Sequence, residues 1–219
     1  MRKRILSVLL AGCLLLSVGC SARENDSGSD ESASKTNDIV EEIPESVQEK
    51  LQSAIDVVPV RISGDAVTDE AVKDLIYIGG EKLKSPFTLS DFGEGVKVIE
   101  DDKFISLNSK TTAFLTYYGM NFASCIVEGE KSVEEMYNAP ITYISFVEYD
   151  YNDESDKVYP VSINGITLNS TLEEAENALG FMEKEESSAD YYILSYENGE
   201  FLVKIYMPQG VVSNIRIEF

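Results

Sequence analysis

The sequence contains no histidine and no tryptophan, and only three of its 219 residues are cysteines. Without histidine, a Ser-His-Asp triad, a Cys-His dyad and an imidazole metal ligand are all excluded. Basic residues are also scarce, because 18 lysines and arginines stand against 39 acidic residues and give a formal net charge of −21. Nucleic-acid binding needs a basic surface against the phosphate backbone, so we expect no nucleic-acid partner.

Long apolar runs are equally rare, and the longest lies at the N-terminus. The basic residues Arg2–Arg4 precede the apolar run Ile5–Val18, which ends at Gly19-Cys20 and is followed by polar residues. This is the layout of a secretory signal peptide. The run is shorter than the roughly 20 apolar residues that a transmembrane helix needs. We therefore predict that residues 1–19 are an export signal.

The end of the apolar run resembles the lipobox of bacterial lipoproteins. In Leu16–Cys20 a small residue precedes the cysteine and a leucine lies upstream, although Ser17 stands where the family prefers leucine. The resemblance implies that Cys20 carries a diacylglyceryl group, whose two acyl chains suffice for stable anchoring to the outer face of the cell membrane. Two alternatives remain: Leu10–Cys13 also matches the pattern, and an ordinary cleaved signal would leave both cysteines incidental.

The composition changes twice after the signal. Residues 20–44 carry almost no large apolar side chain and cannot offset their ordering entropy by burial, so we predict a disordered acidic linker. Apolar residues at helical spacing then predict a short amphipathic helix within 47–55. The remaining chain, about 165 residues, is long enough to bury roughly two thirds of its unfolded surface.

Two segments of the globular part share one pattern: a short apolar strand, a glycine-containing turn, and then Thr-Leu with an acidic residue. The first copy is Ile76–Gly80 with Thr88–Gly93, and the second is Val161–Gly165 with Thr171–Ala175. We interpret this repeat as two tandem units, 45–157 and 158–219.

The second unit carries the clearer signals. Thr171 and Glu174 form a capping-box pattern at the start of a short helix, and Gly180 marks its end. Alternating apolar segments follow in both units and predict antiparallel meanders with one buried face; they are 104–107, 113–117, 120–127 and 141–149, then 191–196, 201–207 and 215–219. The predicted fold class is α+β, with a short helix packed on an antiparallel sheet in each unit.

The segment Asn164–Gly180 with its following meander resembles the extracytoplasmic repeats of the SmpA/OmlA and β-lactamase-inhibitor-like type, which Gram-positive lipoproteins carry in tandem. It differs from them at Asn169-Ser170, where glycine is usual, and at Phe181-Met182, where proline is usual. The resemblance implies an α+β fold and contact with proteins through the sheet, and it implies no catalytic residue.

Candidate chemistry is sparse. Cys125 is the only cysteine of the globular part and has no histidine to activate it, so we expect a buried apolar side chain. The alternating acids of Asp150–Asp156 resemble the start of an EF-hand loop but lack its glycine, at Ser155, and its glutamate, at Val161. A solvated loop is the favoured interpretation, with weak divalent-cation binding as an alternative. A carboxylate-dependent cell-wall hydrolase is a second alternative, since glycosidases need only two acids.

Tyrosines gather in the predicted strands, notably Tyr117, Tyr118, Tyr191 and Tyr192. Tyrosine is enriched at interfaces, although it is also an ordinary residue of a half-buried sheet. We therefore expect a non-enzymatic binding protein without cofactor or metal, anchored to the membrane through Cys20. Its expected partner is an envelope or extracellular protein, or a small ligand, bound at the open face of the sheet.

Overall fold

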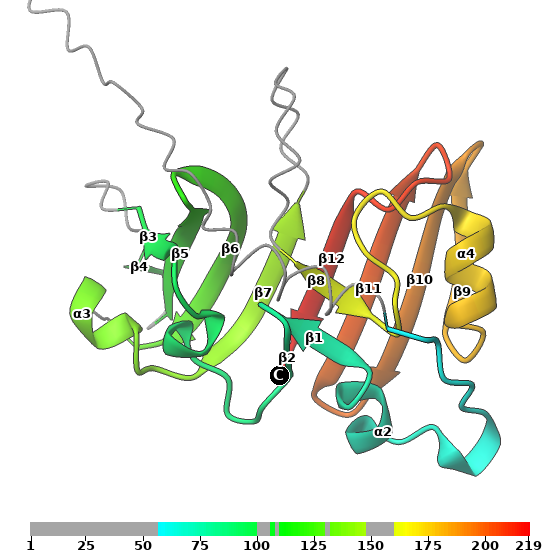
Figure 1. The fold of residues 1–219 in the computed structure, drawn as a ribbon, viewed down its shortest axis with the longest axis horizontal. Coiled ribbons are helices and arrows are strands. Elements are labelled where there is room, and N and C mark those ends of the chain that lie inside the picture. The colour runs from blue at the N-terminus through cyan, green and yellow to red at the C-terminus, as the bar shows by residue number, and fades with distance from the viewer. Residues whose placement is uncertain (1–56, 100–105, 108–109, 130–131, 148–159) are drawn as a thin grey trace, which may run out of the picture. The chain divides into compact units, whose positions relative to one another are not determined.

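The computed structural model describes residues 57–99, 106–107, 110–129, 132–147 and 160–219, which lie within one compact unit. The architecture is mixed but mostly β, with a few short helices and antiparallel strands in two sheets (Figure 1). The prediction of helices with antiparallel sheets is confirmed at this level. The export signal, the linker, the helix within 47–55 and the acidic loop 150–156 lie outside the described residues.

Within the described residues, the larger sheet has nine strands and runs through both halves of the globular chain. Its order is β3 (Val96–Val98), β5 (Lys110–Tyr117), β6 (Met120–Glu128), β7 (Ile141–Val147), β12 (Asn214–Glu218), β11 (Phe201–Pro208), β10 (Tyr191–Asn198) and β9 (Glu183–Ser188), with β4 (Ser106–Leu107) paired to β5. Every pair is antiparallel. The sheet is therefore continuous across β7 and β12, which come from different halves of the sequence.

The smaller sheet also joins the two halves. It consists of β2 (Glu81–Lys82), β1 (Ile76–Ile78) and β8 (Val161–Ile163), and β1 and β8 are the strands of the two sequence repeats. Tyr77 lies opposite Ser162 at the centre of that pairing. In the larger sheet Ser145 lies opposite Arg216 at the centre of the β7–β12 pairing. Strands from the two halves of the chain thus meet antiparallel in both sheets.

The core follows the predicted alternation of the strands. On β11, Phe201, Val203, Ile205 and Met207 are each at most 4% exposed, and Ile215 and Ile217 continue the buried row on β12. Burial of each such side chain contributes roughly 1.5–3 kcal/mol to folding, which is why one face of the sheet stays closed. The predicted strands of the C-terminal half are confirmed as β10, β11 and β12.

Five short helical segments complete the described structure: η1 (Gly64–Ala66), α2 (Asp69–Lys73), η2 (Leu89–Phe92), α3 (Val133–Met136) and α4 (Leu172–Ala178). The predicted capping box is confirmed at α4, where Thr171 and Glu174 bond reciprocally. The same arrangement starts η2 at Thr88 and Asp91, and α3 at Ser132 and Glu135.

Among the residues that the structure describes, none of the helices is long and apolar enough to cross a membrane.

Candidate functional site

The residues predicted to form a binding surface do not come together. Cys20 lies outside the described residues. Tyr117 and Tyr118, at the end of β5, are 2% and 6% exposed, and their ring centroids lie 4.8 Å apart within the core. Tyr191 and Tyr192 are half-buried on β10, separated from β5 by β6, β7, β12 and β11. The first pair therefore offers little surface to a partner, and the second pair offers some.

The second face of the larger sheet carries the side chains that alternate with the core row. The guanidinium of Arg216 lies 4.9 Å from the ring centroid of Tyr143, and Asn214 Nδ2 donates to Ser145 Oγ at 2.8 Å. Further along this face Phe114 is 46% exposed. These contacts organise the middle of the face.

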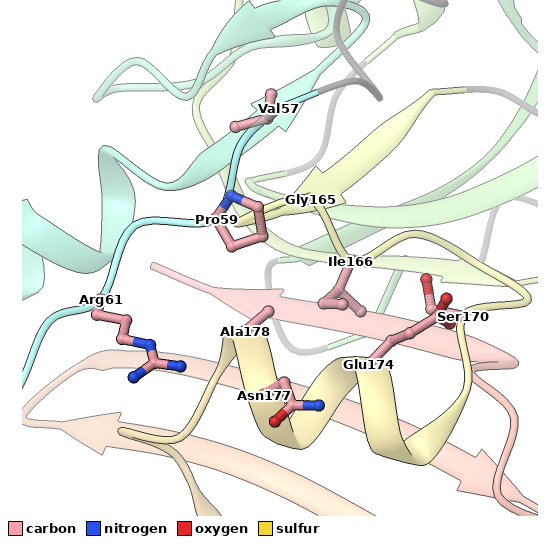
Figure 2. Close-up of a pocket in the computed structure, with 9 residues that line it drawn as sticks. All are labelled: Val57, Pro59, Arg61, Gly165, Ile166, Ser170, Glu174, Asn177 and Ala178. Carbon is pink, nitrogen blue, oxygen red and sulfur yellow. The ribbon is translucent and has the colours of Figure 1, made fainter.

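A groove of about 540 Å³ lies between helix α4 and the segment Val57–Arg61, which we call the strap (Figure 2). Its floor is apolar, formed by Ile166 and Ala178, and α4 contributes Glu174 and Asn177 to one wall. Small-molecule sites in proteins typically measure about 300–1,000 Å³ and combine an apolar lining with a few polar groups. The groove has the size and composition of such a site.

The strap is held in place by a single buried side chain. Asn164 is fully buried; its Oδ1 accepts from Val60 N–H at 2.7 Å, and its Nδ2 donates to Val60 O at 2.9 Å. The same Nδ2 donates to Ala178 O at 2.7 Å, in the last turn of α4. One amide therefore ties the strap to the helix, and it leaves neither donor unpaired.

The residue after this anchor must be glycine for the strap to lie where it does. Gly165 has a φ of +85°, a conformation that other residues rarely adopt. A Cβ at this position would also lie 2.9 Å from the carbonyl oxygen of Val57, closer than such atoms can approach. The Asn164-Gly165 turn thus sets the width of the groove.

Arg61 provides the positive charge of the groove. Its side chain leaves the strap and extends toward α4 in Figure 2. Among the described residues Arg61 makes no ion pair and no hydrogen bond. It remains available for an anionic group.

Glu174 provides the negative charge. Its Oε2 accepts from Thr171 N–H at 2.8 Å and from Thr171 Oγ1 at 2.9 Å. These two hydrogen bonds lower the pKa of the carboxyl group, so it stays ionised to lower pH. Because both bonds use Oε2, the capping box fixes the carboxylate while Oε1 makes no bond to the described residues.

Cys125 is excluded as a nucleophile of this or another site. Its side chain is fully buried on β6, and burial raises the pKa of the thiol to about 12. The expectation of a buried cysteine is confirmed. The described residues also contain no group of three or more cysteines, aspartates or glutamates placed to hold a metal ion.

The sequence alone identified only some of the residues that form the groove. Asn164, Gly165 and Glu174 were recognised through the repeat and the capping box, which are local signals. No sequence pattern marked Arg61, because it follows an irregular segment and only the tertiary fold places it in the same groove as α4.

Comparisons with known proteins identify no relative: no protein-family model, curated protein or solved structure matches the chain.

Proposed function

We propose that this chain is a lipid-anchored, extracytoplasmic binding protein without enzymatic activity, and that its ligand occupies the groove between the strap and α4. The observation that carries the binding role is a groove of ligand size with Arg61 and Glu174 in its lining. Both side chains stand on supports fixed by hydrogen bonds, since Asn164 holds the strap and the capping box holds Glu174. Such fixed supports reduce the entropic cost of binding.

The anchoring role rests on the sequence at the N-terminus. Cys20 ends an apolar run of signal-peptide type, and its diacylglyceryl group would hold the chain at the outer face of the membrane. The acidic linker 20–44, acting as a flexible coil of about 24 residues, would span roughly 25–30 Å. That distance leaves the groove accessible to ligands outside the membrane surface.

The globular part is, in this proposal, a tandem of two related units, 45–157 and 158–219. Two features support the relation: the paired repeat strands β1 and β8, and the central pairing of β7 with β12. The groove belongs to the second unit, closed by a strap from the first.

The anchor is tested by labelling cells that express the full chain with radioactive palmitate. We expect the label in the wild-type protein and in the Cys13→Ser variant, and its loss in Cys20→Ser. Accumulation of unlabelled wild-type protein in the cytosol would overturn the anchoring role.

The binding role is tested by screening a library of small polar compounds against the full-length chain in detergent, with chemical shifts as the readout. We expect the shifts that respond to cluster on Gly165, Asn177 and Ala178, which line the groove. Responses confined to the second face of the sheet, for instance at Phe114 and Tyr143, would place binding there instead.

A further inference from the structure

We infer that the ligand of the groove is a short zwitterionic peptide, with its free carboxylate on Arg61 and its free ammonium group on Glu174. This inference rests on the proposed binding function and adds the chemical class of the ligand. Figure 2 shows the two charged side chains toward opposite ends of the groove, with Asn177 between them. A molecule that carries both charges at its two ends complements this arrangement.

The anionic end of the ligand follows from Arg61. A guanidinium binds a carboxylate through two parallel hydrogen bonds, and Arg61 has no such partner among the described residues. Phosphate forms similar bonds but carries more negative charge. The net charge of −21 and the neighbouring carboxylate of Glu174 both repel a dianion more than a monoanion. The groove therefore favours a carboxylate.

The cationic end follows from Glu174. Its Oε2 is occupied by the two bonds from Thr171, and Oε1 makes no bond to the described residues. The carboxylate is held in one orientation, so an ammonium group gains the interaction without ordering a flexible side chain.

The middle of the ligand meets a surface of mixed character. Ile166 and Ala178 form an apolar floor that suits small aliphatic side chains, and Pro59 of the strap faces them across the groove. The amide of Asn177 can both donate and accept, as a peptide bond requires. Extended backbone of a few residues with small side chains meets these conditions better than a bulky or wholly apolar molecule.

The test uses tri-alanine as the probe and isothermal titration calorimetry on the full-length chain in detergent. We expect measurable binding of tri-alanine, and at least about tenfold weaker binding of its C-terminal amide and of its N-acetyl form, because each removes one charge pair. Inorganic phosphate at the same concentration should not compete.

Two substitutions assign the charges to residues. Arg61→Gln should weaken tri-alanine binding about tenfold but leave the affinity for the C-terminal amide unchanged. Glu174→Gln should also weaken tri-alanine binding about tenfold but leave the affinity for the N-acetyl form unchanged. Because glutamine can still complete a capping box, the helix is retained. Lys84→Gln and Glu173→Gln remove exposed charges outside the groove lining and should leave both affinities unchanged.

Absence of tri-alanine binding at millimolar concentration would overturn the inference, as would equal binding of the amide, the N-acetyl form and the free peptide. In either case groove-localised responses to other compounds would leave the proposed binding function intact. If the compound screen gives no response in the groove, the binding function fails together with the inference.

Discussion

At the scale of single residues, Asn164 is the side chain on which the groove depends. It occupies a left-handed conformation with a φ of +52° and makes three hydrogen bonds from a fully buried position. Asn169 shares the left-handed conformation, with a φ of +71°, but is exposed and makes no side-chain bond to the described residues. Comparing substitutions at these two positions therefore distinguishes the contribution of the hydrogen bonds to stability from that of the backbone conformation.

Replacing Asn164 by glycine should lower the free energy of unfolding by about 2–3 kcal/mol, because the strap loses its anchor and the buried carbonyl of Ala178 loses the bond from Asn164. Glycine tolerates the left-handed conformation, so strain does not contribute. Asn169→Gly should change the same free energy by no more than about 0.5 kcal/mol. Urea unfolding followed by circular dichroism measures both; equal effects would show that the three bonds contribute little.

Cys125 makes the stability of the fold sensitive to alkaline pH. Burial raises the pKa of its thiol from the ordinary value of 9.0 to about 12, so the folded state keeps the proton that the unfolded state releases. Ionisation of Cys125 therefore leaves the free energy of unfolding undiminished below pH 9 and lowers it as the pH rises toward 12. Cys125→Ala should reduce this fall between pH 9 and pH 11 in urea unfolding experiments, and an unchanged slope would assign the fall to other groups.

At the scale of secondary-structure elements, the sequence predicted what has local or periodic causes. Helix α4 follows from its capping box, and β11 follows from four alternating apolar residues. Strand β9 was missed because all six of its residues are exposed and no apolar alternation marks it. In the described part of the chain it is an edge strand paired with β10, and its charges oppose pairing with another chain. Its position depends on β10, so no local signal could reveal it.

The candidate tyrosine surface failed to assemble for a related reason. Alternation identifies which residues share a face of one strand, but it does not say which face of the finished sheet is covered. Tyr117 lies on the covered face and Tyr118 in the turn beyond it, and both are buried. The strap is harder still to anticipate, since Val60 meets Asn164 from 104 positions away in the sequence.

The capping box of α4 should contribute more to the free energy of unfolding than a simple helix cap does, and this contribution should depend on pH. Thr171→Ala removes the hydroxyl that bonds both the backbone and Glu174, and should cost about 1–2 kcal/mol. Thr68, at the start of α2, accepts one bond from Ala71 N–H without a carboxylate in return. Thr68→Ala therefore serves as the matched control, with an expected cost of about 0.5–1 kcal/mol.

The contributions of the two caps to stability should respond differently to acid. The pKa of Glu174 is lowered in the folded state, so its stabilising contribution is present above the ordinary value of 4.5 and is lost as the pH falls below it. The difference in unfolding free energy between wild type and Thr171→Ala should therefore shrink between pH 5 and pH 3, measured by urea unfolding. The difference for Thr68→Ala should stay constant; parallel behaviour of the two variants would contradict a role for the Glu174 charge.

At the scale of the whole molecule, the two halves of the globular chain are joined at three places. β1 pairs with β8, β7 pairs with β12, and the strap of the first half is anchored by Asn164 of the second. Each half alone would expose the central edges of both sheets, including the row of Ile144 and Ile217 that is buried when the halves meet. A repeat pattern in the sequence does not therefore mean that the two halves fold independently.

We accordingly expect that the fragments 45–157 and 158–219, expressed separately, will not unfold cooperatively, and that mixing them in equal amounts will restore a cooperative transition and a one-to-one complex. The reason is that β7–β12 alone supplies five residue pairs at the centre of the larger sheet, where burial is greatest. Urea unfolding by circular dichroism and size-exclusion chromatography measure the two effects. If either fragment alone unfolds in a sharp transition at the midpoint of the intact chain, the halves are autonomous domains and their shared edges contribute little to stability. An Asn164→Gly substitution in the second fragment refines the test: complex formation should weaken without being abolished, because the strap is lost while both strand pairings remain.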